Sequence, residues 1–563
     1  MGKFIGDKTG QKFKRIFIKF VFWSLLGIVT LLPAGMQIFK WRMLPKSDQE
    51  QVYIWLEATR SSNIENIEDI TKDVNSFMEE YIHSENNDSE LDIIKWISYW
   101  VWLAPMWDFA NLFRGASMRS GENYISMRVN LTPANERDIA SEEFVIKLRP
   151  IFREYMLEKY PKLNIRILED PPGPPVRATF MLKVSSEQWE NHENIEKIAT
   201  FLEAKLKPFL EANNVEDIAT TKDSYKTNYK LKFDHELVSR LGLNMEQISY
   251  AIYNIFEGTN ISIYHDDHMK EAVNIYLSVN KLEKNRQDIL KNISFTTPQG
   301  KKVPLSEIAK ILPTEKEKII YSDDRLPTVY IYGEMGDNSV IYPMISLFGT
   351  FLKDDFWWDD FEVSKWDLYW FEIKDTSSGK HYFVNFGGEW KLSIDTFRDL
   401  WLAMIIALLA IYFMMVAQFR SFRIWGNIMI TFLLGFFWVM PLFTGLFLFD
   451  NQYFSATSMI WVIALAGIVV GNAIMYIEYL NILLDSWHGL RYSILEAGSR
   501  RLKPIIITSL TTILGATTIL GDPVWSGLAR SIIWWLIASA SLTLFIIPIF
   551  LYDTLKKVRP EVD

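Results

Sequence analysis

The 563-residue sequence contains no cysteine. Disulfide bridges and thiolate metal sites are therefore excluded, and cysteine usage gives no information on the redox compartment. Long Lys/Arg runs are also absent, and the formal net charge is −9, so the basic footprint of a nucleic-acid-binding protein is missing. The sequence has no nucleophile elbow, phosphate-binding loop or zinc-ligand helix motif, so nothing in it supports catalysis.

What the sequence has in abundance is apolar and aromatic side chains. They make up 49% and 15% of the chain, with 21 Trp and 37 Phe residues. This composition is rich for a soluble enzyme and ordinary for a membrane protein. The chain is longer than a domain with a single hydrophobic core usually is, so two or more structural units are expected.

Six apolar segments approach the ~20 residues needed to cross a bilayer. One, at 15–38, follows a short basic tail at 1–14. It runs into the aromatic-basic stretch "FKWR" rather than a small-residue cleavage site, which favours a retained anchor over a signal peptide. The other five lie within 396–553, at about 398–418, 426–449, 455–482, 504–521 and 528–552.

Basic residues occur in alternate connections between these segments and in the tail at 554–563. They are Arg420 and Arg423; Arg491, Arg500, Arg501 and Lys503; and Lys556, Lys557 and Arg559. The positive-inside rule then places both termini in the cytoplasm and residues 40–395 on the far side of the membrane. Residues 485–503 are expected to form an amphipathic helix on the inner surface.

The polar region between the first and second apolar segments alternates strand and helix patterns. Strands are expected at 51–58, 123–131, 163–168 and 177–184, and helices at 63–84, 141–160 (with a Ser cap) and about 190–211. Such repeated units predict small split βαβ sandwiches. A further module at 225–325 contains a strand "NYKLKF", a helix "NMEQISYAIYNIFEG" and a turn at "TPQGKK".

Two features of the polar region could bind a ligand. The segment at 96–113 is dense in aromatics, and Trp102, Trp107, Phe109 and Phe113 could line an apolar pocket, or equally form core or a subunit interface. The stretch "YHDDHMKE" (264–271) holds residue types that bind metals, but its spacing matches no ligand pattern, so a solvated loop is the better interpretation. No metal and no cofactor are expected.

Polar residues inside the apolar segments are candidates for function, because they are costly in a membrane. Glu478 could act there, or it could lie at the cytoplasmic end of its helix and reach water. Asn472 lies deeper and could also simply bridge helices. Thr508, Thr511 and Thr512 share a helix face and could order a proton path, or could bond their own backbone.

Several long motifs, in order, resemble the resistance-nodulation-division (RND) efflux transporters. They are "GPPVRATF" (173–180), "VSRLGLNMEQISYAIYNIFEG" (238–258), "VPLSEIAKI" (303–311), "GGEWKLSIDTFRDL" (387–400), "VAQFRSF" (416–422), "ALAGIVVGNAI" (464–474), "EAGSRRLKPIIITSLTTILG" (496–515) and "GDPVWSGLARSIIWWLIASASLTLFIIPIFLYD" (521–553). The chain resembles only the second of the family's two tandem units, each of one helix, an outer domain and five helices.

The resemblance implies an α+β membrane protein with six transmembrane helices (1+5) and a large extracytoplasmic domain. That domain would contain two split βαβ porter modules, at 45–174 and at 175–220 with 326–390, and a docking module at 225–325. The family implies a proton-driven antiporter that assembles as an inner-membrane trimer for xenobiotic export. It passes small amphiphilic compounds from the periplasm or bilayer to an adaptor and an outer-membrane channel. Cargo would contact residues 102–113 and the loop of Pro171, Pro172, Pro174 and Pro175.

The resemblance also implies a proton relay and shows a gap in it. Thr508 and Arg501 match relay residues of the family, and Asn472 and Glu478 match its Asn and acidic residue. Gly471 stands where many second units carry a cation, and the paired aspartates of the first unit have no counterpart here. The expected function is therefore the second-half subunit of a split exporter, with a separately encoded first-half partner. The alternatives are a self-assembling half transporter without the usual relay and a non-transporting membrane scaffold or sensor.

Overall fold

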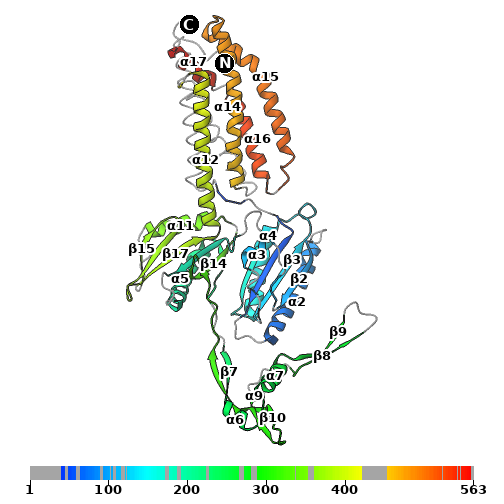
Figure 1. The fold of residues 1–563 in the computed structure, drawn as a ribbon. Helices are drawn as coiled ribbons and strands as arrows, with labels where there is room; N and C mark the ends of the chain where they lie inside the picture. The colour runs from blue at the N-terminus through cyan, green and yellow to red at the C-terminus, as the bar shows by residue number, and fades with distance from the viewer. Residues whose placement is uncertain are drawn as a thin grey trace.

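The structure is a computed structural model. It describes residues 40–44, 48–58, 64–88, 93–101, 103–105, 109–115, 119, 121, 123–170, 176–186, 192–222, 227–265, 272–280, 288–336, 338–352, 361–420, 422, 453–522, 524–541, 543–544 and 547–558. The described chain forms a helical bundle, two α/β units at one end of it, and a smaller segment beyond them (Figure 1).

The first α/β unit is a four-stranded antiparallel sheet in the order β2-β3-β1-β4. Its elements are β1 (Gln51–Glu57), α2 (Ile64–Asp88), β2 (Ile94–Val101), α3 (Phe109–Arg114), β3 (Tyr124–Leu131), η2 (Ala134–Glu136), α4 (Ser141–Lys159) and β4 (Asn164–Glu169). This βαββαβ order is the split βαβ arrangement that the strand and helix spacing predicts.

Strand alternation in β1 divides this unit into two faces. Val52, Ile54 and Leu56 point to a core built with α2 and α4. Tyr53 and Trp55 point the other way and are also buried, together with Leu168 of β4. A sheet buried on both faces must be covered on the second by something other than its own helices. That cover is the second α/β unit.

The start of α4 differs from the expected serine cap. The residue before the helix is Ala140, and no side chain of the local sequence caps it. The backbone N–H of Ser141 instead donates to Asp48 Oδ1 (2.8 Å), and Ser141 Oγ donates to Glu169 Oε1 (2.6 Å). Because the capping carboxylate comes from a residue 93 positions away, local sequence could not reveal it.

The second α/β unit repeats this topology in a larger sheet. Its elements are β5 (Phe180–Ser185), α5 (His192–Ala212), β6 (Val215–Thr220), β13 (Ser322–Asp323), β14 (Leu326–Met335), α11 (Ile341–Leu352), β15 (Phe361–Trp366), β16 (Trp370–Asp375) and β17 (His381–Gly387). The strands β6, β14, β5 and β17 lie in the same relative order as β2, β3, β1 and β4, and the β15–β16 hairpin extends the edge. Residues 221–321 are inserted between β6 and the β13–β14 hairpin.

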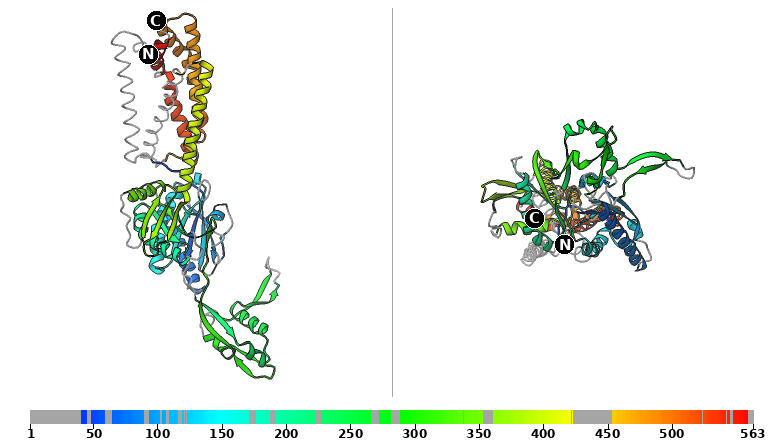
Figure 2. Two further views of the ribbon diagram at one scale, coloured as in Figure 1. Left: turned by 60° about the vertical axis from the view of Figure 1, so that its left-hand side comes forward. Right: turned by 90° about the horizontal axis from the view of Figure 1, so that it is seen from below.

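The inserted segment forms a small unit of its own with a projecting hairpin. Its elements are β7 (Thr227–Phe233), α6 (His235–Arg240), α7 (Met245–Phe256), β8 (Thr259–Tyr264), β9 (Val273–Leu277), α9 (Asp288–Asn292), β10 (Ser294–Thr296), β11 (Lys302–Pro304), α10 (Leu305–Ile308) and β12 (Ala309–Glu315). The expected turn at "TPQGKK" is the β10–β11 connection, where Gly300 has φ 83°. The β8–β9 hairpin extends away from the body as an arm (Figure 2).

The helical bundle contains α12 (Gly388–Phe419), α14 (Ala456–Asp485), α15 (Leu490–Thr517), α16 (Ser526–Ser541) and α17 (Ile547–Val558). Within the described chain, α12 and α14 are the two helices that are long and apolar enough to cross a membrane. They contain the spans expected at 398–418 and 455–482. The spans expected at 15–38 and 426–449 lie outside the described residues.

One boundary in the bundle differs from expectation. The amphipathic helix expected at 485–503 and the span expected at 504–521 form one continuous helix, α15, with Pro504 inside it. Neighbouring groups in a bundle can compensate for the hydrogen bond that a proline removes, so Pro504 does not end the helix. Helices α16 and α17 lie in the region of the span expected at 528–552, and residues 542, 545 and 546 between them lie outside the described residues.

The bundle meets the α/β units at the start of α12. Strand β17 runs directly into α12 at Gly388, whose φ is 62° and where a Cβ would lie 2.6 Å from the carbonyl oxygens of Ala178 and Thr179. Only glycine fits this close approach. Nearby, Arg42 pairs with Glu142 of α4 (2.9 Å). The two α/β units are thus fixed at one end of the bundle.

Candidate functional site

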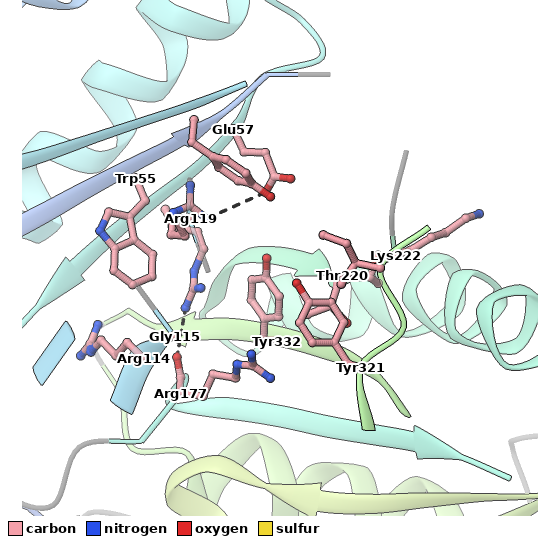
Figure 3. A pocket seen from close by; sticks show the side chains of 14 residues that line it. Trp55, Glu57, Arg114, Gly115, Arg119, Arg177, Thr220, Lys222, Tyr321 and Tyr332 are labelled. Carbon is pink, nitrogen blue, oxygen red and sulfur yellow. Dashed lines mark hydrogen bonds and ion pairs between the residues drawn. The ribbon is translucent and has the colours of Figure 1, made fainter. Parts of the chain in front are cut away.

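A pocket lies where the second face of the first sheet meets the second α/β unit (Figure 3). Strands β1, β3 and β4 contribute to one wall, and β6, β14 and the segments before β5 and β13 form the other. The lining residues are Trp55, Glu57, Arg114, Gly115, Arg119, Tyr124, Arg166, Arg177, Thr220, Thr221, Lys222, Ile319, Tyr321 and Tyr332. The cavity volume is about 60 Å³.

The pocket is lined by an excess of positive charge. Four arginines and one lysine face one carboxylate, that of Glu57. Arg114, Arg119 and Arg166 are each less than a tenth exposed. Burying a guanidinium is costly unless it is paired and hydrogen-bonded, so the partners of each arginine decide what the site can bind.

Arg166 is the best compensated of these arginines. It projects from β4, and its Nη2 lies 2.6 Å from Glu334 Oε1 on β14, so this buried ion pair joins the two α/β units. Arg166 also lies over the ring of Tyr332, 4.3 Å from its centroid. Burial opposes the charge of Arg166, but Glu334, Tyr332 and Asp217 together outweigh burial and raise the pKa of the guanidinium.

Arg119 is compensated much less. Its Nη1 lies 3.9 Å from Glu57 Oε2, and its Nη2 donates a long hydrogen bond (3.3 Å) to the carbonyl of Leu56. The guanidinium lies between the rings of Trp55 and Tyr124, 4.9 and 4.8 Å from their centroids. Burial lowers the pKa of Arg119, and Glu57 only partly opposes this effect. The charge of Arg119 is therefore available to a further anion.

Arg114 occupies the end of α3, and among the described residues Nη2 is the guanidinium nitrogen with a hydrogen-bond acceptor. Its Nη2 donates to the carbonyl of Glu169 (2.7 Å). Gly115 follows with φ 78°, which ends the helix in the left-handed conformation and brings the chain against Arg177 of the second unit. Arg177 lies over the ring of Tyr330, 4.5 Å from its centroid. The pocket is thus built from both units.

Several arginine N–H groups at the pocket are buried without an acceptor among the described residues. They are Arg114 Nε and Nη1, Arg119 Nε and Arg166 Nε. Buried donors in native proteins are nearly always paired with protein or water. This arrangement therefore fits a site that is completed by water or by a bound anion.

The aromatic and proline residues proposed from the sequence are only partly described. Phe113 lies on α3 and is 52% exposed, and Phe109 begins the same helix. Trp102 and Trp107, and the loop of Pro171, Pro172, Pro174 and Pro175, lie outside the described residues. Helix α3 reaches the pocket through Arg114.

Sequence reasoning missed the arginines of this pocket. They come from separate stretches of the chain, so no local motif links them. One signal was present: Arg166 interrupts the apolar strand "LNIRIL", and period-two alternation places it on the face opposite Ile165 and Ile167. An arginine on the second face of a buried strand suggests an ion pair or a binding site.

The five proposed relay positions lie on two neighbouring helices. Gly471, Asn472 and Glu478 are on α14, and Arg501 and Thr508 are on α15. In the described part of the chain, no hydrogen bond or ion pair joins any two of them. Asn472 is buried and its Nδ2 has no partner there, whereas Glu478 is exposed.

The residues on α15 make mostly local contacts. Thr508 is exposed, and its hydroxyl donates to the carbonyls of Pro504 and Ile505 (both 3.1 Å). Thr511 and Thr512 also donate to a carbonyl of their own helix, that of Thr508. The guanidinium of Arg501 lies over the ring of Tyr479 on α14, 5.2 Å from its centroid. The backbone-bonded arrangement is thus the one present for these threonines.

Comparison with known proteins gives a family match over most of the chain. The sequence model described as the AcrB/AcrD/AcrF family matches residues 13–341 and 373–555. The Swarming motility protein SwrC of Bacillus subtilis (strain 168) is 29% identical over 345 residues, which are 59% of this chain and 30% of SwrC.

Solved structures with a similar fold include two crystal forms of a heavy metal efflux pump. Form II aligns with a TM-score of 0.68 at 16% identity, over 98% of this chain and 50% of the pump chain. Form I aligns with a TM-score of 0.65 at 16% identity, over 96% of this chain and 50% of the pump chain. The chain therefore spans half the length of these solved relatives, and at this identity the likeness concerns the fold alone.

Proposed function

This chain belongs to the AcrB/AcrD/AcrF family of RND permeases, and from that premise we propose that it is the second-half subunit of a split exporter. The observation that carries the proposal is the coverage of the solved pump. Nearly all of this chain, 98%, aligns with 50% of the pump chain. One unit of a tandem permease would give this result, and a separately encoded first-half protein would supply the other unit.

In this proposal the parts of the chain have the roles of a permease half. The units at 45–174 and at 175–220 with 326–390 are porter modules, and 225–325 is a docking module. Six helices cross the bacterial inner membrane, with both termini in the cytoplasm and residues 40–395 in the periplasm. Support comes from Arg420, the C-cap of α12, and Arg491, the second residue of α15, because the C-terminal end of α12 and the start of α15 lie at the end of the bundle remote from the sheets (Figure 1).

The proposed assembly is a trimer that works with an adaptor and an outer-membrane channel. The β8–β9 arm supports such contacts, because it exposes apolar side chains that its own chain does not cover. These are Ile261, Ile263, Tyr264, Val273, Ile275, Tyr276 and Leu277. Helices α12 and α15 also expose apolar faces, which fits contact with lipid and with the first-half protein.

Proton coupling in this proposal comes mostly from the first-half partner. Gly471 supplies no charge, and a Cβ placed there meets nothing within 4 Å among the described residues, so this position has space but no cation. Asn472, Glu478 and Arg501 are the polar groups that α14 and α15 offer beside it. Thr508 is exposed and therefore positioned to face a partner.

The cargo is proposed to be a small amphiphilic compound that passes between the porter modules. The arginine-lined pocket supports this route, because it lies between the two α/β units and is built from both. The aromatic segment at 102–113 and the prolines at 171–175 remain proposed cargo contacts.

Co-purification and a transport assay test the proposal. Tagged chain should capture a distinct protein with six spans and intramembrane acidic residues, and cells expressing both should accumulate less of an amphiphilic dye than cells expressing either alone. Export by this chain alone would indicate a self-assembling half transporter. Unchanged accumulation in both cases, at normal membrane levels, would favour the scaffold or sensor.

A further inference from the structure

We propose that the arginine-lined pocket binds a compact anionic group, so that the cargo recognised there carries a carboxylate, sulfate or phosphate. The assignment of this anion to a cargo molecule rests on the export function proposed above. The binding chemistry itself rests on the charge, the unpaired donors and the size of the pocket.

Charge is the first argument. Lining side chains contribute five cations and one carboxylate, and the nearby Glu334 is already paired with Arg166. A pocket that selected a cationic compound would need the opposite balance, because like charges in a poorly solvated site repel strongly. A neutral ligand would leave the buried charges of Arg114 and Arg119 without a further counter-charge.

The second argument comes from the hydrogen-bond donors. Arg114 and Arg119 together have three buried guanidinium nitrogens without an acceptor among the described residues. The one carboxylate near Arg119 is 3.9 Å away, beyond good hydrogen-bond distance. An oxyanion placed between these side chains would accept several charge-assisted hydrogen bonds at once, which planar guanidinium groups are shaped to donate.

The pocket's size fits a compact group. A cavity volume of about 60 Å³ leaves room for several water molecules, and so for one carboxylate, sulfate or phosphate. Lys222 and Ile319 are exposed and mark the mouth, whereas Trp55, Arg119 and Tyr332 are buried inside. An anionic headgroup would occupy the interior, and its apolar part would extend past Ile319 and Tyr321.

The rings stabilise the pocket in the absence of an anion. Guanidinium groups over aromatic faces gain a cation–π attraction that partly replaces water. The ring centroid of Trp55 lies 4.9 Å from the guanidinium carbon of Arg119 and 5.4 Å from that of Arg166. The ring of Tyr332 also lies against the guanidinium of Arg166. These contacts hold the guanidinium planes in fixed positions, which lowers the entropic cost of binding.

The experiment is a calorimetric titration of the full chain in a neutral detergent at constant ionic strength. The probes are octyl sulfate, octyltrimethylammonium, octyl glucoside and inorganic sulfate. The variants are Arg119→Met, Glu57→Gln and, as a matched control, Lys310→Met, which removes an exposed cation of β12 outside the pocket. The unfolding midpoint of each variant is measured without probe.

Octyl sulfate should bind the wild type more tightly than the cationic and neutral probes. Losing the charge-assisted hydrogen bonds of Arg119 should weaken its affinity about tenfold or more in Arg119→Met. Glu57→Gln should tighten it, because this change removes the one lining carboxylate, and Lys310→Met should leave it unchanged. If Arg119→Met does not fold, the octyl sulfate affinity of Glu57→Gln tests the proposal, since this variant keeps every arginine.

Two results would overturn the proposal. One is octyl sulfate binding that is no tighter than octyltrimethylammonium binding, or that is insensitive to both pocket variants. The other is inorganic sulfate binding as tightly as octyl sulfate, which would indicate a free-anion site unrelated to cargo. Anion binding that depends on Arg119, in a chain that exports nothing with any partner, would refute the export function and leave the binding site standing.

Discussion

The buried ion pair between Arg166 and Glu334 gives the sharpest prediction about how the two α/β units are held together. Both side chains are about a twentieth exposed, and their charged atoms are 2.6 Å apart. Glu334 also lies near Thr179, whose hydroxyl donates to its Oε2 (3.2 Å). Glu334→Gln keeps the shape of the side chain but leaves Arg166 buried without its counter-charge.

Breaking a buried pair from one side costs about 3–5 kcal/mol, because the remaining charge is uncompensated. Taking about 3 kcal/mol, and about 2–4 °C per kcal/mol for a unit of 150–250 residues, the unfolding midpoint should fall by roughly 6–12 °C. The assay is thermal unfolding of the full chain in detergent, followed by tryptophan fluorescence.

A surface pair supplies the control. Asp69 and Lys72 are 3.5 Å apart with side chains 64% and 75% exposed, so Asp69→Asn should cost about 0–1 kcal/mol. The reasoning is refuted if Glu334→Gln shifts the midpoint no more than Asp69→Asn does. Added sulfate should restore part of the loss in Glu334→Gln alone, because an anion in the pocket would replace the missing carboxylate by mass action.

Three further predictions concern other parts of the chain. Ile263→Asp on the exposed β8 should reduce the oligomer mass measured by light scattering, while Leu312→Asp on β12, outside the arm, should not. At the β16–β17 turn, burial opposes the charge of Asp375, but hydrogen bonds from Ser378 and Ser377 outweigh it and lower the pKa from 3.8 to about 2. The midpoint difference between wild type and Asp375→Asn should therefore be constant above pH 4 and vanish as the pH falls towards 2; a difference that grows on acidification would contradict this. Thr508→Val should change stability by less than about 0.5 kcal/mol, since the hydroxyl bonds carbonyls of its own helix, yet should lower dye export; unchanged export would exclude a relay role.

Much of the local structure follows from periodicity in the sequence. The alternation in "QVYIWLE" predicts β1, and the helical spacing from Ile64 to Tyr81 predicts α2. These patterns depend on neighbours within a few residues, so a single sequence contains them. The start of α4 was not predictable in the same way, because Asp48, which caps it, belongs to a different part of the chain.

Helix continuity in the bundle was also beyond local reasoning. Basic residues before Pro504 and apolar ones after it indicated two elements, whereas α15 runs through both from Leu490 to Thr517. Buried contacts decide this outcome: Ile494 and Ala497 pack in the same cluster as Tyr476 and Leu480 of α14. Packing of that kind stabilises a helix across a change in composition that would otherwise suggest a boundary.

The pocket shows why a site between two units is harder to predict than either unit. Each sheet can be inferred from strand and helix order, and Trp55 and Arg166 can be assigned to the face of the first sheet that its own helices leave uncovered. What covers that face depends on the second unit, which supplies Glu334 to one arginine and leaves Arg119 with a distant carboxylate. The unequal compensation of two arginines is therefore a tertiary property, and it is this inequality that makes the pocket a candidate anion site and not only a buried salt bridge.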